Sequence, residues 1–212
     1  MTGALVLREA RRGFSGTAWL PVAFFLIVAT IVPFAVGPDA ELLSRIGGGA
    51  LWIAALTAAL LPIERLIEPD RADGVLDQLA IAGVAEEAAG AAKILGHWLA
   101  FGPMLLVATV PASFLVGLDG PALFRCLVAL AIGTPALAAL AVAVAALTSG
   151  LPRAGALAGL LLLPLAVPLV IFGAAATGDG ESAALKLEAA VALLTVAGAP
   201  FVTGAAIRAA RT

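Results

Sequence analysis

Residues 127–150 read LVALAIGTPALAALAVAVAALTSG, an apolar run that contains no Asp, Glu, Lys or Arg. At 1.5 Å of rise per residue, a helix of this length crosses the roughly 30 Å of hydrocarbon in a bilayer. The run lacks the alternation of apolar and polar residues that marks a strand of a membrane barrel. Backbone groups in lipid must be paired within the segment, so the run is predicted to be a transmembrane helix.

Similar runs precede and follow it, and together they predict an all-α integral membrane protein with six transmembrane helices. The predicted spans are residues 18–37, 47–63, 98–118, 127–150, 154–177 and 189–207. Of the 212 residues, 62% are hydrophobic and only 12% are charged, and the mean hydropathy is +1.11. Soluble domains carry about 25% charged residues. A soluble enzyme is therefore excluded, and the net charge of −2 says little about partners.

The distribution of Lys and Arg predicts the orientation of the spans. With both termini in the cytoplasm, most basic residues fall on the cytoplasmic side, as the positive-inside rule requires. The predicted cytoplasmic residues are Arg8, Arg11, Arg12, Arg65, Arg71, Lys93, Arg153, Arg208 and Arg211. The predicted outer residues are Arg45, Arg125 and Lys186.

The first residues of the chain have an amphipathic pattern. On a helical wheel, one face is apolar and the opposite face is basic, which predicts a short helix lying in the cytoplasmic interface. The apolar face comprises Val6, Leu7, Ala10 and Phe14, and the polar face comprises Arg8, Arg11, Arg12 and Ser15. A cleaved signal is the alternative, but the apolar run that follows is a full span in length.

Several kinds of chemistry are not expected in this chain. The six predicted spans contain no Asp, Glu, Lys or Arg, so a proton or ion pathway is not expected. A P-loop requires Gly-Lys-Ser/Thr, yet Lys93 and Lys186, the only lysines, follow Ala92 and Leu185. The single Cys126 excludes an internal disulfide. The chain is therefore not expected to be catalytic by itself or to hold a metal.

Every predicted span contains at least one proline. Proline removes one backbone hydrogen bond and clashes with the preceding turn, which favours a kink. Pro164 and Pro168 stand one turn apart, and Pro135 lies in the fourth span. These three residues are candidate hinges between two states, although proline is also simply tolerated in membrane helices.

The only long loop, residues 64–97, lies between the second and third spans. It begins ERLIEPDRADGVLDQL (residues 64–79). Asp70 or Asp73 is expected to cap a short helix, because a carboxylate accepts hydrogen bonds from the first-turn amides. Residues 84–95 are then expected to form a second helix that leads into the third span.

The short helix has an apolar edge with acidic and amide residues beside it. Such an edge suits docking into a groove of a soluble partner. A helix lying on the membrane is the alternative, but acidic flanks disfavour it because the inner leaflet is negative. The candidate docking residues are Asp70, Asp73, Gly74, Val75, Leu76, Asp77, Gln78 and Leu79.

Four stretches, in this order, resemble the heme exporter protein B family (CcmB), a membrane subunit of an ABC-type complex in cytochrome c maturation. They are Asp70-x-x-Asp73-Gly74-x-Leu76-x-Gln78-Leu79, AKILGHWL at residues 92–99, GTPAL at residues 133–137 and LPLAVPLVIFG at residues 163–173. The resemblance covers nearly the whole chain. One departure is AIAGVA at residues 80–85, where the family usually has a Leu-rich Ser-Pro-Leu-Pro stretch.

The resemblance implies one ABC-type permease domain over residues 1–212, in the bacterial inner membrane. It implies a separate CcmA-like ATPase that binds ATP, with the loop helix as the ATPase-coupling element. CcmC- and CcmD-like membrane subunits and a CcmE-like heme chaperone would complete the system. Heme would be a transient substrate, and no cofactor would be bound stably by this chain.

His97 and Trp98 are candidate contacts for heme or for an interface. His97 is the only histidine, so a bis-His heme site within one chain is excluded. Both residues are predicted to lie at the cytoplasmic end of the third span, where an interfacial or packing role is favoured.

Other functions fit parts of the sequence. An ABC-2 type permease exporting a lipid or small amphipath would use the same loop, and a membrane assembly scaffold needs no transport. A lipid-modifying transferase would need clustered Asp, His or Arg at one membrane face. Asp70, Asp73 and Asp77 would share one helical face and could hold Mg²⁺, but no basic cluster for a phosphate headgroup accompanies them. Six helices form half of an ABC translocator, and the other half is an identical copy or a different subunit.

Overall fold

The computed structural model describes residues 2–14, 19–178 and 182–210, which are largely helical and contain no strand. Six of the described helices are long and apolar enough to cross a membrane. The elements are α1 (Thr2–Phe14), α2 (Trp19–Val36), α3 (Ala40–Leu60), the 3-10 helix η1 (Ile63–Arg65), α4 (Glu68–Ala72), α5 (Val75–Ile81), α6 (Glu86–Leu115), α7 (Gly120–Thr148), α8 (Ala154–Ala175) and α9 (Ser182–Ala209). The all-α fold with six membrane helices is confirmed, and the protein is a multi-pass membrane protein.

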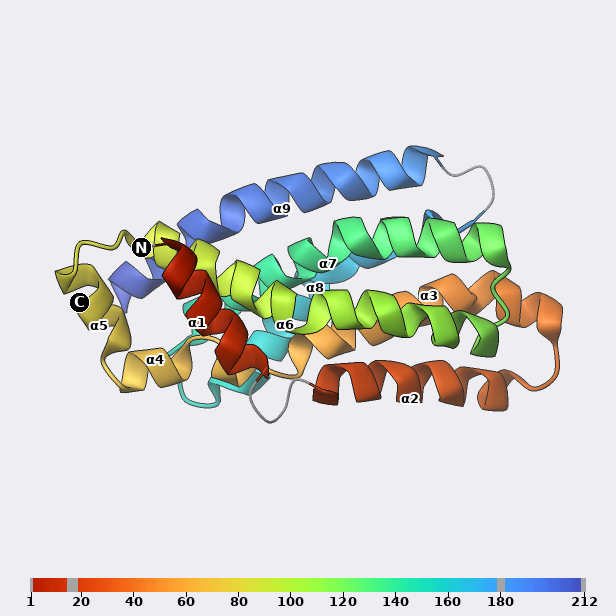
Figure 1. The fold of residues 1–212 in the computed structure, drawn as a ribbon, viewed down its shortest axis with the longest axis horizontal. Helices are drawn as coiled ribbons and strands as arrows, with labels where there is room; N and C mark the ends of the chain where they lie inside the picture. Colours follow the sequence, from red (N-terminus) through yellow and green to blue (C-terminus); the bar gives the residue numbers. More distant parts are fainter. Residues whose placement is uncertain (1, 15–18, 179–181, 211–212) are drawn as a thin grey trace.

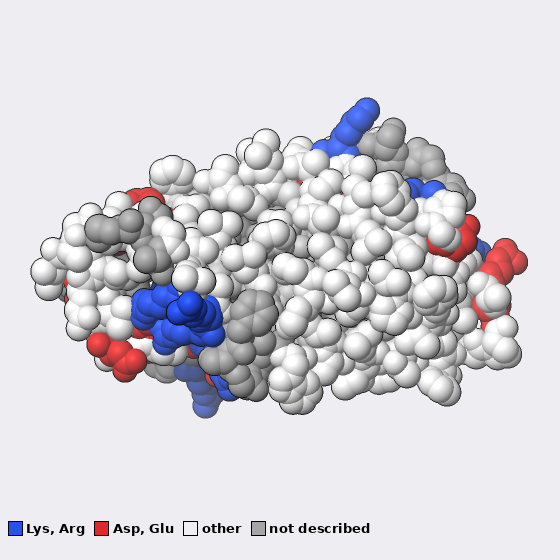
Figure 2. All heavy atoms as spheres, viewed as in Figure 1, with Lys and Arg blue, Asp and Glu red and all other residues white. Residues whose placement is uncertain are grey.

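The six long helices lie along one axis and form an elongated bundle (Figure 1). Helices α1, α4 and α5 gather at one end, which we call the loop end, and the opposite end is the far end. On the face drawn in Figure 2, charged residues gather toward the two ends and the middle is almost free of them. A bilayer requires this distribution, because only the ends of the bundle meet water and lipid headgroups.

Four of the long helices, α3, α6, α7 and α9, begin before the spans expected from hydropathy. Helix α3 begins at Ala40, where Asp39 caps it by accepting from the backbone N–H of Leu42 at 2.9 Å. Helix α6 runs without a break from Glu86 to Leu115, so residues 84–95 do not form a separate helix. The stretch before Trp98 contains no proline that could end the helix, and tertiary packing continues along it.

Helix α7 lies at the centre and has the largest buried share of the six. It packs against α3, α6, α8 and α9. Its second half is rich in alanine, including a buried run at residues 136–139 and another at residues 141–146. Small side chains allow neighbouring helices to approach closely where no hydrophobic effect drives them together.

The indole of Trp52, on α3, is fully buried between two glycines. An added Cβ at Gly133 of α7 would overlap its Cη2 atom, and one at Gly173 of α8 would overlap its Cζ2 atom. The neighbouring Thr134 accepts a hydrogen bond from Nε1 of Trp98 at 3.1 Å. The GTPAL stretch on α7 thus fits against tryptophans from α3 and α6.

The Trp52 contact predicts a difference between two glycine-to-alanine variants. Gly133→Ala should lower the free energy of unfolding by about 1–3 kcal/mol, because the rigid indole has no space to move into. Gly159→Ala on α8 adds the same methyl group to open space and should change it by no more than about 0.5 kcal/mol. Thermal unfolding in detergent measures both, and equal midpoints would contradict this account of the packing.

Candidate functional site

The loop between α3 and α6 folds into two short helices at the loop end. Helix α4 has Pro69 in its first turn and ends at Ala72, with Asp73 as its C-cap. Gly74 follows with φ of 69°, a left-handed conformation that glycine adopts without strain, and α5 begins at Val75. Gly74 occupies the N-cap position of α5, and no side-chain hydrogen bond from a described residue caps the helix. The expectation that Asp70 or Asp73 caps this helix is therefore wrong.

The predicted apolar edge of α5 is only partly available to a partner. Leu76 is buried in the bundle, and Val75 and Leu79 are half-buried. The exposed residues are Asp77, Gln78 and, at 88% exposure, Ile81. Ile81 was not predicted as a docking residue, because the predicted docking helix ended at Leu79. Its position five residues after Leu76 places it on the opposite side of the helix.

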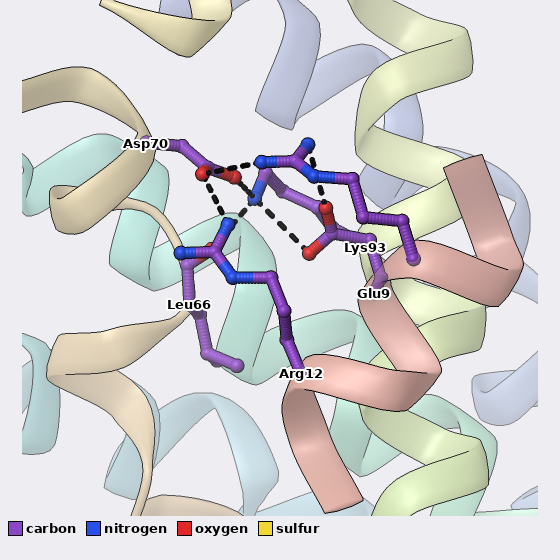
Figure 3. A network of polar contacts seen from close by, with 6 residues as sticks. Glu9, Arg12, Leu66, Asp70 and Lys93 are labelled. Carbon is purple, nitrogen blue, oxygen red and sulfur yellow. Dashed lines mark hydrogen bonds and ion pairs between the residues drawn. The ribbon is translucent and has the colours of Figure 1, made fainter. Parts of the chain in front are cut away.

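Asp70, assigned to the docking edge by its sequence, instead faces inward. Its carboxylate is 1% exposed and pairs with Lys93 of α6, which is 4% exposed (Figure 3). Nζ of Lys93 also donates to the carbonyl oxygen of Leu66 at 3.0 Å and lies 3.4 Å from Oε2 of Glu9. The buried ammonium thus has three oxygen partners, which offset its loss of hydration.

Two arginines of α1 complete the cluster. Arg12 pairs with Oδ1 of Asp70, and Nη2 of Arg8 lies 3.1 Å from the same oxygen. The hydrogen bond to Asp70 raises the pKa of Arg12 above its ordinary value. Helix α1 also packs closely on α6, because an added Cβ at Gly96 of α6 would overlap the side chain of Glu9. We call Glu9, Arg8, Arg12, Asp70 and Lys93 the ion cluster, and it ties α1, α4 and α6 together.

Helix α4 is also bound to the turn between α7 and α8. Oε2 of Glu68 accepts from the backbone N–H of Gly150 at 2.9 Å, and Arg71 pairs with Glu68 across one turn. Gly150 has φ of 79°, and its Cα faces the guanidinium of Arg71 closely enough that an added Cβ would lie 3.3 Å from Cζ. The loop is therefore anchored to two separate parts of the bundle.

A pocket of about 480 Å³ lies beside α5. It is lined by Arg71, Leu76, Asp77, Ser149, Ile207 and Ala210. These residues come from α4, α5, the α7–α8 turn, the C-terminal part of α9 and the residue that follows α9. Of the exposed residues of α5, Asp77 lines this pocket, so the exposed side of the helix borders a hollow at the loop end.

The three aspartates proposed for a metal site do not share a helix. Asp70 lies in α4, Asp73 is its last cap residue and Asp77 lies in α5, because Gly74 separates the helices. Asp70 is also held by Lys93 and Arg12. Within the described ranges, no three His, Cys, Asp or Glu side chains gather closely enough to hold a metal ion.

His97 and Trp98 are placed within α6 rather than at its end. His97 is buried, and its ring centroid lies 4.8 Å from that of Phe101. Trp98 is half-buried and donates to Thr134. These positions favour packing, and the heme contact stays a prediction.

The candidate hinge prolines lie inside continuous helices. Pro135 is half-buried in α7, whereas Pro164 and Pro168 are exposed on α8. Their role as hinges stays a prediction.

One ionisable residue inside the bundle was missed. Glu188 fell just outside the last predicted span, which began at residue 189, but α9 begins at Ser182 and buries this side chain completely. The predicted spans, as bounded, contain no Asp, Glu, Lys or Arg, but the longer α9 adds Glu188 to the buried part of the bundle. The hydropathy run ended where the charge occurs, although the helix continues past it.

The ion cluster makes Asp70 a strong determinant of stability. Asp70→Asn should lower the free energy of unfolding by about 3–5 kcal/mol, because Lys93 would stay buried without its main counter-charge. Asp73→Asn, an exposed position in the same loop, should change it by no more than about 0.5 kcal/mol.

Removing both charges tests the same pairing further. Asp70→Asn combined with Lys93→Met should recover part of the loss, since no unpaired ammonium remains. Chemical unfolding in detergent measures all three variants. Equal losses for Asp70→Asn and Asp73→Asn would show that the cluster does not stabilise the fold.

Comparisons with known proteins agree with this architecture. The family model described as CcmB protein matches residues 4–210. Heme exporter protein B of Paracoccus denitrificans is 45% identical over 97% of each chain, and that of Rhodobacter capsulatus is 44% identical over 97% of each. Heme exporter protein B of Escherichia coli is 40% identical over 94% of each chain. The matched region includes the loop, the ion cluster and all six long helices, and the chain belongs to the CcmB protein family.

Proposed function

We propose that this chain is the membrane subunit of an ABC-type complex that serves heme export in cytochrome c biogenesis. Its relatives are named heme exporter protein B, and its six membrane helices match a permease half. A separate CcmA-like subunit would bind and hydrolyse ATP, so the chain itself would not be catalytic. CcmC- and CcmD-like subunits would complete the complex, and a heme-loaded CcmE-like chaperone would be released on the outer face.

One observation carries the proposal for coupling: α5 is exposed on one side and rigidly anchored on the other. Its outer side presents Asp77, Gln78 and Ile81. Its inner side buries Leu76, and the preceding helix α4 is held by the buried Asp70–Lys93 pair. A surface that must receive force from a partner requires both properties, because a loosely held helix would move without moving the bundle.

Force on α5 would follow the contacts of α4. Gly74 joins the two helices, so a push on α5 displaces Asp70 and Glu68. Asp70 passes the displacement to α6 and α1 through Lys93 and Arg12, and Glu68 passes it to the α7–α8 turn through Gly150. The work of ATP hydrolysis in the partner would thereby reach three parts of the bundle.

The loop end would face the cytoplasm, where an ATPase has access to ATP. Arg8, Arg12, Arg71, Lys93 and Arg208 all belong to ion pairs at or near this end. The positive-inside rule assigns such an end to the cytoplasm of a bacterial inner-membrane protein. Heme would be a transient substrate, and ATP would bind only to the partner.

The exposed side of α5 can be tested without disturbing the core. Ile81→Asp should weaken binding of the CcmA-like ATPase by about tenfold or more, the loss expected for a central apolar anchor. ATPase stimulation by this chain should fall in parallel, while its thermal stability is unchanged because residue 81 is 88% exposed. Co-purification and ATPase rates in reconstituted membranes provide the two measurements.

Gly120→Asp is the matched control, because it adds the same charge at the opposite end, where the position is exposed and open. It should retain both binding and stimulation. A complex with Ile81→Asp that binds and stimulates like the wild type would exclude α5 as the docking surface.

A further inference from the structure

Glu188 is a carboxyl group buried without a partner in a membrane helix. Its side chain is 0% exposed, and neither Oε1 nor Oε2 has a hydrogen-bond partner among the described residues. Buried polar groups are nearly always hydrogen-bonded, and an ionisable group within a membrane bundle usually has a function. Glu188 takes no part in the ion cluster or in the proposed docking surface.

The position of Glu188 along α9 places it toward the far end. Arg208, on the same helix, pairs with Glu87 near the loop end. The two positions are separated by about 30 Å at 1.5 Å per residue. The far end also carries an open pocket of about 550 Å³, whose lining includes Arg45, Arg125 and Thr177. Water at the far end is therefore the nearest aqueous phase for Glu188.

The carboxyl group lies against the same glycine that receives Trp52. An added Cβ at Gly133 would lie 2.8 Å from Oε1 of Glu188 and would overlap the indole. The Nε1 donor of Trp52 is itself buried without a described partner. We call this junction of α3, α7 and α9, where Trp52, Gly133 and Glu188 meet, the far-end seam.

Among the residues that the structure describes, no charged or titratable neighbour neutralises an ionised Glu188. On α7, the buried thiol of Cys126 lies near Glu188. The adjacent residue, Arg125, lines the far-end pocket and donates from Nε to the carbonyl oxygen of Thr177 at 3.0 Å. Helix α3 contributes Trp52, and α8 contains no titratable residue over its length.

The described residues of the two remaining helix surfaces also give Glu188 no counter-charge. Lys186, on α9 itself, is exposed. Helix α6 also packs on α9, and its Glu86 and Glu87 pair with Arg208 near the other end. An unpaired carboxylate is strongly disfavoured in such surroundings, whereas the protonated acid is neutral.

We propose that Glu188 is a proton-binding site that controls the opening of the far-end seam. With the seam packed as observed, the carboxyl group carries a proton. Ionisation requires water, and water reaches the carboxyl when α9 separates from α7 at Gly133. Opening therefore releases one proton to the aqueous phase at the far end, and closing takes one up, with no other bond made or broken.

The sign of the pH dependence follows from this linkage. The closed seam binds one more proton than the open seam, so low pH favours closure and high pH favours opening. A carboxyl that stays protonated as a fixed packing element would give no such dependence. The proposal needs no partner subunit, so it stands or falls independently of the ATPase-docking proposal.

Infrared spectroscopy of the full chain in lipid nanodiscs detects the bound proton directly. With ¹³C-labelled glutamate, the wild type should show the C=O stretch of a protonated glutamic acid at neutral pH, where exposed glutamates are ionised. Glu188→Gln should lack this band, and Glu41→Gln, at an exposed position on α3, should retain it. Absence of the band from the wild type, or its presence in Glu188→Gln, would overturn the proposal.

Cys126 reports the opening, because it is the only cysteine and is buried close to Glu188. Its alkylation rate by N-ethylmaleimide is measured against pH in the wild type and in Glu188→Gln, so that the thiol's own titration cancels in the ratio. The ratio of the wild-type alkylation rate to the Glu188→Gln rate should rise with pH. The rise should be up to about tenfold per pH unit above the pH at which Glu188 ionises in the open seam. A ratio that does not change with pH would overturn control of the seam by the proton.

A conservative variant guards against loss of folding. If Glu188→Gln does not accumulate in membranes, Glu188→Asp keeps a titrating carboxyl with a shorter reach. In Glu188→Asp, the band of the protonated acid should be absent from the label on glutamate and present with ¹³C-labelled aspartate instead. The pH at which this band disappears should also shift. A glutamate band that persists unchanged in Glu188→Asp would assign the proton to another residue and overturn the proposal.

Discussion

The buried pair of Asp70 and Lys93 is the interaction on which the loop end depends. Both side chains have lost almost all contact with water, and such a pair is stable only when further partners complete it. The Leu66 carbonyl and the arginines of α1 provide these partners. Three elements that are distant in sequence are therefore held by one cluster, and none can shift without exposing or unpairing a buried charge.

The buried carboxyl of Glu188 has surroundings opposite to those of Asp70. Asp70 is surrounded by cations and keeps its charge, whereas Glu188 meets an indole, a glycine and a thiol. The first arrangement fixes a structure, because separating the ions is costly. The second leaves the charge state free to follow the packing, because a proton can leave as soon as water enters. Location and neighbours, rather than residue type, decide between a fixed element and a responsive one.

The sequence predicted the six membrane helices because long charge-free runs allow few other structures. It also predicted a short helix from about Asp73 to Leu79 from the apolar spacing, but the expected aspartate cap is absent and Gly74 occupies that position. It did not reveal that Asp70 faces inward, because Lys93 and Arg12 are 23 and 58 residues away along the chain. Glu188 was missed for a related reason: hydropathy ends a span at a charge, but a helix ends where its backbone hydrogen bonds end.

The two ends of the bundle are connected through α6 and α9. Helix α6 is bound to α4 through Lys93, and its first turn pairs with Arg208 of α9 through Glu87. Helix α9 then carries Glu188 about 30 Å away at the far-end seam. A displacement of α4 would thus reach α9 through two ion pairs, and the rigid helix would deliver it to the contact with Gly133. Because α7 is fixed on several sides by close helix packing, α9 is the element whose movement would open the seam.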